Sequence, residues 1–106
     1  MFIWGYRPED WIYTGLPAAT RYLDSQALTG VPADRHLSQS TPITSTGVAE
    51  ARREVAASHP EFVLDGLTPF NADLSMEKYP ELAAWMKQYS EVARTKLTII
   101  YRKRVP

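Results

Sequence analysis

Two short apolar runs, each closed by a glycine, limit what this chain can fold into. Phe2-Ile3-Trp4 is followed by Gly5, and Phe62-Val63-Leu64 is followed by Asp65-Gly66. Uninterrupted runs of aromatic and β-branched residues are typical of buried strands, and the glycines mark the turns that end them. A helical pattern lies between the two runs, so we expect the strands to be parallel and joined by a helical crossover.

The first helical pattern lies just before the second apolar run. Val48, Ala51 and Val55 recur at i, i+3 and i+7 and so fall on one helical face. The charged residues between them, including Arg52, are expected to cover the rest of the helix, and the narrow apolar stripe predicts a helix on the surface. We expect it to end at His59-Pro60, because the residue before a proline is disfavoured in α geometry.

The second helical pattern follows the second run. Tyr79, Leu82, Met86 and Tyr89 share one helical face, and Pro80 suits the first turn, where its missing N–H costs nothing. We therefore expect one helix to cover this stretch.

Two further apolar stretches predict a hairpin at the end of the chain. Residues 91–94 and 97–102 are expected to be its strands, with Thr95-Lys96 as the turn. Residues 23–45, rich in polar residues, glycine and proline, predict a long irregular connection. The predicted fold is a single α/β domain over residues 1–106: a small layered sheet with parallel strands and crossover helices, plus a C-terminal antiparallel hairpin.

Composition excludes several kinds of chemistry. The chain of 106 residues has no cysteine, which removes disulfides, thiol catalysis and thiolate metal sites. Twelve basic residues balance twelve acidic ones, so we expect no nucleic-acid partner. The five glycines are isolated and no histidine or carboxylate pair has metal-ligand spacing, so we expect no phosphate-binding loop, metal or cofactor.

Basic residues are concentrated near the end of the chain. Residues 94–104 hold five cations and no acid, whereas residues 1–93 hold seven cations and twelve acids. Such a segment can contact phosphate or an anionic membrane. The favoured interpretation is that these cations keep an edge strand from pairing with other chains.

Few residues suggest catalysis. A hydrolase that uses His36 with Ser38 or Ser40 is the weakest hypothesis, because the sequence has no recognisable nucleophile elbow. His59 is expected to cap a helix end. Asp65 follows a predicted strand, at the sheet edge where ligands gather in α/β proteins. The favoured interpretation for Asp65 is nevertheless that it makes the turn with Gly66.

Three sequence blocks carry a resemblance. They are residues 2–6 with 12–13 and 17–23, then residues 60–66, and finally residues 79–82 with Tyr89 and residues 101–104. In this order they resemble the soluble C-terminal region of bacterial polytopic membrane glycosyltransferases, which are similar to dolichyl-phosphate-mannose–protein mannosyltransferases and lipid A aminoarabinose transferases. The resemblance covers nearly the whole chain, although each of its elements is short.

The resemblance implies a non-catalytic accessory domain excised from a longer membrane protein and lying outside the cytoplasm. The family's catalytic acid belongs to the membrane region, and nothing here corresponds to it, so we expect no transferase activity from this chain alone. The implied partners are the membrane-embedded catalytic region of the same protein and a polyprenyl-phosphate sugar or its acceptor. The candidate substrate-binding residues are Tyr6, Arg7, Thr20, Arg21, Tyr22 and Asp65.

Some alternatives stay open at this level. The guanidinium of Arg21 suits a phosphate or a carboxylate, but it is equally suited to pairing with Asp24 or Asp65. The chain could instead be a stand-alone small-molecule binding module of α/β type, which predicts a closed apolar pocket with a few convergent polar groups. The terminal hairpin also suggests a homodimer formed by pairing two copies.

Overall fold

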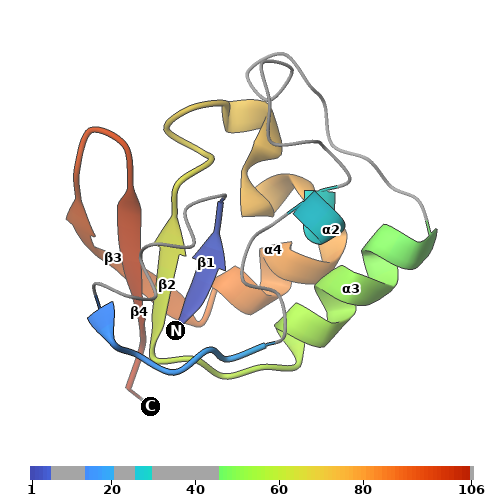
Figure 1. The fold of residues 1–106 in the computed structure, drawn as a ribbon, viewed down its shortest axis with the longest axis horizontal. Coiled ribbons are helices and arrows are strands. Elements are labelled where there is room, and N and C mark those ends of the chain that lie inside the picture. The colour runs from blue at the N-terminus through green and yellow to red at the C-terminus, as the bar shows by residue number, and fades with distance from the viewer. Residues whose placement is uncertain (6–13, 21–25, 30–45, 106) are drawn as a thin grey trace.

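A four-stranded mixed sheet forms the centre of the computed structural model, which describes residues 1–5, 14–20, 26–29 and 46–105 (Figure 1). The strand order is β1-β2-β4-β3. Strand β1 (Phe2–Trp4) pairs in parallel with β2 (Phe62–Asp65), and β2 pairs antiparallel with β4 (Ile99–Lys103). Strand β3 (Tyr89–Arg94) pairs antiparallel with β4 and forms the edge. The predicted α/β fold, its parallel pair and its terminal hairpin are confirmed.

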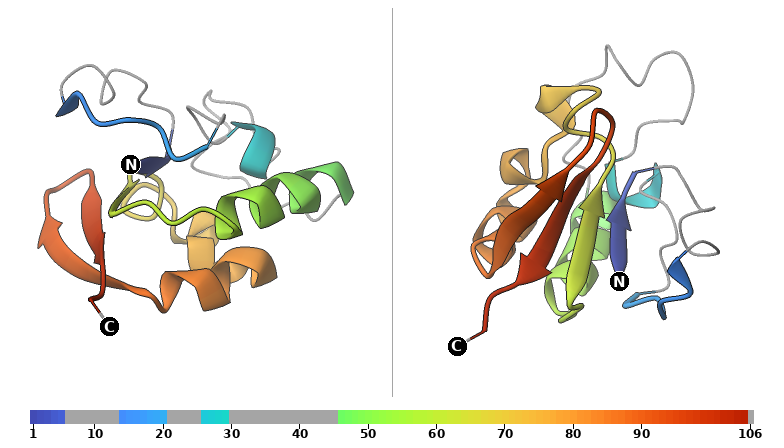
Figure 2. Two further views of the ribbon diagram at one scale, coloured as in Figure 1. Left: turned by 90° about the horizontal axis from the view of Figure 1, so that it is seen from below. Right: turned by 90° about the vertical axis from the view of Figure 1, so that its left-hand side faces the viewer.

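Helices cover one face of this sheet. Helix α3 (Thr46–Ala56) lies in the crossover between β1 and β2, and α4 (Pro80–Met86) lies between β2 and β3. Both lie on the same side of the sheet and pack against each other (Figure 2). The short helix α2 (Gln26–Thr29) packs on α3. Two 3₁₀ helices, η1 (Ala72–Leu74) and η2 (Met76–Lys78), follow β2.

The parallel pair places its largest side chains against the helices. Phe2 and Trp4 are fully buried in the core that the sheet shares with the helices. The Trp4 ring meets the Tyr79 ring edge-on at 5.3 Å between centroids, and its Nε1 donates to the carbonyl of Leu74 at 2.7 Å. The Phe2 ring meets Trp85 edge-on at 5.8 Å. Aromatic contacts therefore fix a first strand of only three residues.

The second helix is shorter than the sequence pattern predicts. Pro80 opens α4 as expected, but the helix ends at Met86, and Tyr89 begins β3. The Tyr89 hydroxyl donates to the carbonyl of Pro60 at 2.6 Å, and its ring packs on Trp85 at 5.0 Å. The prediction that Tyr89 lies in the helix is wrong. Its spacing from Met86 fits a helical face, but its pairing with β4 places it in a strand.

The hairpin and the long connection also differ from expectation. The turn has four residues, not two: the Thr95 amide donates to the Thr98 carbonyl at 2.8 Å, and the Thr95 hydroxyl accepts from the Thr98 amide at 3.0 Å. The stretch 23–45, predicted to be irregular, contains α2; its residues 23–25 and 30–45 lie outside the described part of the chain.

The position of β4 corrects one interpretation of the basic residues. Strand β4 lies between β2 and β3, so its cations do not protect a sheet edge. Of the five cations in residues 94–104, only Arg94 belongs to the edge strand β3. The cations of β4, Arg102 and Lys103, therefore need another explanation.

We predict that Trp4→Phe destabilises the domain by about 2–4 kcal/mol, because it leaves the buried Leu74 carbonyl without its donor and opens a cavity. Trp85→Phe is the matched control: Trp85 is also buried, but its Nε1 donates at 3.0 Å to the carbonyl of Ser58, a partly exposed residue, so water can replace this donor. Urea denaturation of both variants measures the difference. Equal losses would contradict the special position of Trp4.

Candidate functional site

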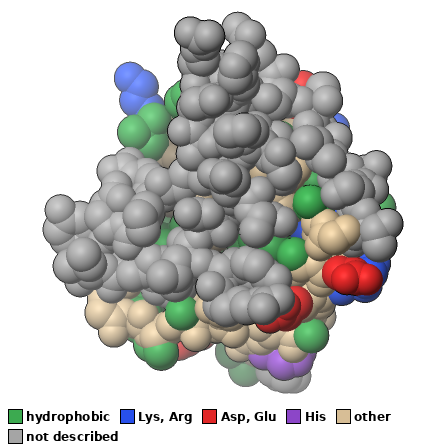
Figure 3. All heavy atoms as spheres, turned by 45° about the vertical axis from the view of Figure 1, so that its right-hand side comes forward, with side chains coloured by type: hydrophobic (Ala, Val, Ile, Leu, Met, Phe, Trp, Pro, Cys, Tyr) green, Lys and Arg blue, Asp and Glu red, His purple; other side chains and the backbone are tan. Residues whose placement is uncertain are grey.

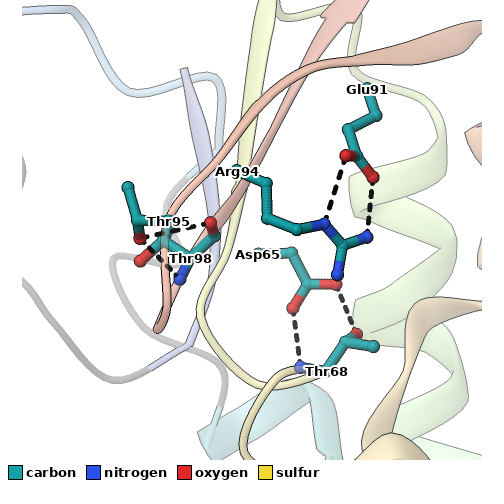
Figure 4. A network of polar contacts seen from close by, with 6 residues as sticks. All are labelled: Asp65, Thr68, Glu91, Arg94, Thr95 and Thr98. Carbon is teal, nitrogen blue, oxygen red and sulfur yellow. Dashed lines mark hydrogen bonds and ion pairs between the residues drawn. The ribbon is translucent and has the colours of Figure 1, made fainter.

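Asp65 lies where β2 ends, and its carboxylate closes the turn that follows. The side chain is 1% exposed. Its Oδ1 accepts from the backbone amides of Leu67 at 3.0 Å and Thr68 at 2.9 Å, and its Oδ2 accepts from the Thr68 hydroxyl (Figure 4). The structure thus assigns this carboxylate a turn-closing role, which the sequence favoured for it.

The backbone of β1 also contacts this turn. The Gly66 amide donates to the carbonyl of Trp4 at 2.8 Å. Gly5 lies beside Gly66: a Cβ added to Gly5 would be 3.5 Å from the Gly66 Cα, an ordinary van der Waals contact. The ends of the two parallel strands therefore meet here, with Asp65 beside them.

Burial dominates the electrostatics of Asp65. It raises the pKa of this carboxyl above its ordinary value of 3.8, although the hydrogen bonds from Thr68 and Leu67 and the charge of Arg94 act in the opposite direction. The Arg94 guanidinium comes from β3 and binds Glu91 through contacts of 2.7 and 3.1 Å. In Figure 4 it lies between the carboxylates of Glu91 and Asp65.

A pocket of about 250 Å³ adjoins the buried carboxylate, between the sheet and the segment of η2 and α4. This volume lies below the roughly 300–1,000 Å³ of most small-molecule sites. Burial, followed by the negative charges of Asp65 and Glu91, raises the pKa of Tyr101, so its phenol is a neutral group at neutral pH. The lining residues are Asp65, Ser75, Met76, Glu77, Ala83, Met86, Lys87 and Tyr101.

This pocket can accept a small polar group rather than a large apolar ligand. Its lining mixes methionine and alanine side chains with charged ones, and both Glu77 and Lys87 are exposed. It therefore differs from the closed apolar pocket that a small-molecule binding module predicts.

Of the other predicted binding residues, Thr20 is the one that the structure describes. The segment that leads to Thr20 docks at the beginning of β1, where the Met1 amine donates to the Pro17 carbonyl at 2.8 Å and the Ala19 amide donates to the Met1 carbonyl at 3.0 Å. Asp65 pairs with the end of β1. Also predicted, but outside the described residues, are Tyr6, Arg7, Arg21 and Tyr22, together with His36, Ser38 and Ser40.

Arg52 is the buried charged residue that the sequence interpretation missed. It was expected to be on the polar part of α3, yet it is 1% exposed. Its Nη1 donates to the carbonyl of Leu28 in α2 at 2.8 Å, and its Nε donates to Glu81 of α4 at 3.1 Å. Its guanidinium carbon lies 4.5 Å from the centre of the Tyr79 ring. One side chain thus ties α2, α3 and α4 together.

A signal for this burial exists in the sequence. Val48, Ala51, Arg52 and Val55 follow the i, i+3, i+4, i+7 spacing of a single helical face, so Arg52 lies on the apolar stripe itself.

Burial alone would raise the pKa of Glu81, the partner of Arg52, but the hydrogen bond and charge of Arg52 bring this pKa below its usual value.

Within the described part of the chain, no group of three or more histidine, cysteine, aspartate or glutamate side chains could hold a metal ion. No helix there has the length and apolar character needed to cross a bilayer. Comparisons of the chain with protein-family models, with curated proteins and with solved structures found no match.

Replacing Asp65 by asparagine keeps an oxygen for the Leu67 and Thr68 amides but removes the ionisable group. Because the pKa of Asp65 is raised on folding, the wild-type carboxyl stabilises the fold fully below pH 3.8, and this contribution is lost as the pH rises through the folded-state pKa. We predict that the difference in unfolding free energy between wild type and Asp65→Asn, from urea denaturation, falls as the pH rises above about 4. A difference that grows with pH would contradict this account of Asp65.

We predict that Arg52→Met costs about 2–3 kcal/mol of stability, because it leaves the Leu28 carbonyl and the Glu81 carboxylate without their donor. The Glu81 side chain is 14% exposed, so water partly solvates its carboxylate in the variant. The neighbouring Arg53 is exposed, and Arg53→Met should change stability by less than about 0.5 kcal/mol. Chemical denaturation of the two variants compares them directly. Similar losses for both would show that the buried ion pair has no special weight.

Proposed function

We propose that this chain is a non-catalytic accessory domain of a membrane glycosyltransferase that uses a polyprenyl-phosphate sugar donor, and that it lies outside the cytoplasm. One observation carries the proposal: the three sequence blocks behind the resemblance, widely separated along the chain, contribute to one packed unit. Trp4 of the first block contacts Tyr79 of the third, and Val63 of the second pairs with Tyr101 of the third.

The roles of these residues support an accessory domain rather than a catalytic one. Trp4 and Tyr79 are fully buried, and Tyr89 is 3% exposed, so their rings serve packing. Asp65 directs both carboxylate oxygens to the turn after β2. Because the residues behind the resemblance serve packing, the resemblance concerns the fold. We therefore expect the transferase activity to belong to the membrane-embedded region of the same protein.

In this role the domain packs against the membrane-embedded region and helps to position the donor or its acceptor. The candidate contacts remain Tyr6, Arg7, Thr20, Arg21 and Tyr22. Arg21 is the candidate for a phosphate, because a planar guanidinium can donate two parallel hydrogen bonds to phosphate oxygens.

A second candidate function, a small-molecule binding module, is favoured by a different feature. A groove of about 420 Å³ runs between residues 16–19 and residues 58–62. Its volume is within the usual range for ligand sites, and its lining includes Leu16, Pro17 and Phe62, but it is an open groove and not the closed pocket expected from the sequence. A screen of small molecules by thermal shift tests this candidate.

The DNA upstream of the codon for Met1 tests the first proposal. We predict an open reading frame that encodes several apolar spans of about 20 residues each, the length that crosses a bilayer. A stop codon with a ribosome-binding site immediately upstream would contradict the accessory-domain proposal, and the binding-module candidate would then take its place.

A further inference from the structure

Cations gather at the end of the molecule where β2 begins and β4 ends. The Lys103 amide donates to the Glu61 carbonyl at 2.8 Å, which joins the two strands there. A groove of about 330 Å³ opens at this end, and Figure 1 places both marked chain ends on the same side of the molecule. We name the surface formed by Arg102, Lys103, Arg104 and Val105 the basic end face.

The cations of the basic end face are available to an anion outside the protein, because their contacts within the protein are weak. Arg102 pairs with Glu61 at 2.7 Å, but their side chains are 55% and 60% exposed, and such exposed pairs contribute little. Arg104 donates to the neutral hydroxyl of Ser90 at 2.7 Å. Glu61 is the single acid among the described residues that line the groove, against three cations.

Apolar side chains accompany these cations. Val105 is 89% exposed, and Leu16, which lines the neighbouring 420 Å³ groove, is 39% exposed. Both grooves include His59 and Glu61, so they adjoin each other. On the right of the face in Figure 3, basic side chains lie beside acidic ones. Exposed apolar groups next to unbalanced cations are typical of surfaces that lie against lipid headgroups.

We infer that the basic end face contacts an anionic phospholipid surface. Its cations are spread over an exposed surface, and no charged side chain lining the groove is buried, so the arrangement suits a plane of headgroups better than one enclosed phosphate. Each lysine or arginine near such a membrane strengthens binding by about fivefold. The inference rests on the proposed function: a membrane protein that carries this domain holds it close to the bilayer, where a weak contact with headgroups can form.

Sedimentation with lipid vesicles at about 0.1 M salt, where the Debye length is about 10 Å, tests this inference. The chain should bind vesicles made of equal parts phosphatidylglycerol and phosphatidylcholine but not phosphatidylcholine alone, and a further increase in salt should release it. Lys103→Glu/Arg104→Glu should weaken the partition coefficient by at least about 25-fold, the product of two fivefold contributions.

The matched control is Lys78→Glu/Lys96→Glu, which makes the same change in net charge at exposed residues of η2 and the hairpin turn. It should weaken binding less than about threefold, because charges farther than a Debye length from the lipid are screened. Circular dichroism verifies that both variants fold.

Three results would overturn the inference. They are no binding by the wild type, equal weakening in both double variants, and displacement by inorganic phosphate at constant ionic strength, which would indicate a discrete anion site. None of these depends on the upstream reading frame, so a failure here is distinguishable from a failure of the proposed function.

Discussion

The buried indole of Trp4 is the contact on which the rest of this small domain depends. A strand of three residues has few backbone hydrogen bonds, so its side chains must hold it in the sheet. An indole buries on the order of 200 Å², which stabilises the fold by roughly 5 kcal/mol. Trp4 adds a hydrogen bond to Leu74 and, through its backbone carbonyl, one from Gly66. Trp4 therefore anchors the first strand and also contacts the turn after β2, which the Asp65 carboxylate closes.

The same contact extends into the helical layer. The Tyr79 ring contacts both Trp4, with 5.3 Å between the ring centroids, and the guanidinium carbon of Arg52, which is 4.5 Å from the ring centre. Arg52 in turn binds Glu81 of α4 and the Leu28 carbonyl of α2. The sheet is thus linked to α4, α3 and α2 through one series of contacts, in which Arg52 is a buried charged side chain.

Local signals were sufficient where the sequence pattern and the tertiary structure agree. The two apolar runs predicted the parallel pair, and Pro80 marked the start of α4. The same signals failed where long-range pairing decides: Tyr89 fits a helical face but pairs with Lys103 of β4. Arg52 was expected to face solvent because it is charged, although it lies on the apolar stripe. Its partners in α2 and α4 are distant in sequence, so the local pattern did not indicate them.

The candidate site was predicted in part. The sequence placed Asp65 at a strand end and favoured a turn-closing role, which its hydrogen bonds to Leu67 and Thr68 bear out. It could not show that the segment before Thr20 docks at the opposite end of β1, because that depends on the tertiary contact between Met1 and Ala19. The basic end face likewise follows from strand order, which puts β4 inside the sheet.

Amide hydrogen exchange of Gly66 is the most direct test of whether Trp4 holds β1 in the folded core. This amide donates to the Trp4 carbonyl at 2.8 Å, so its exchange reports on the attachment of β1. If Trp4 anchors the strand, the Gly66 amide exchanges only on global unfolding, with the same opening free energy as the slowest amides of β4. Exchange through a much cheaper local opening, while β4 stays protected, would show that β1 is a loosely attached strand.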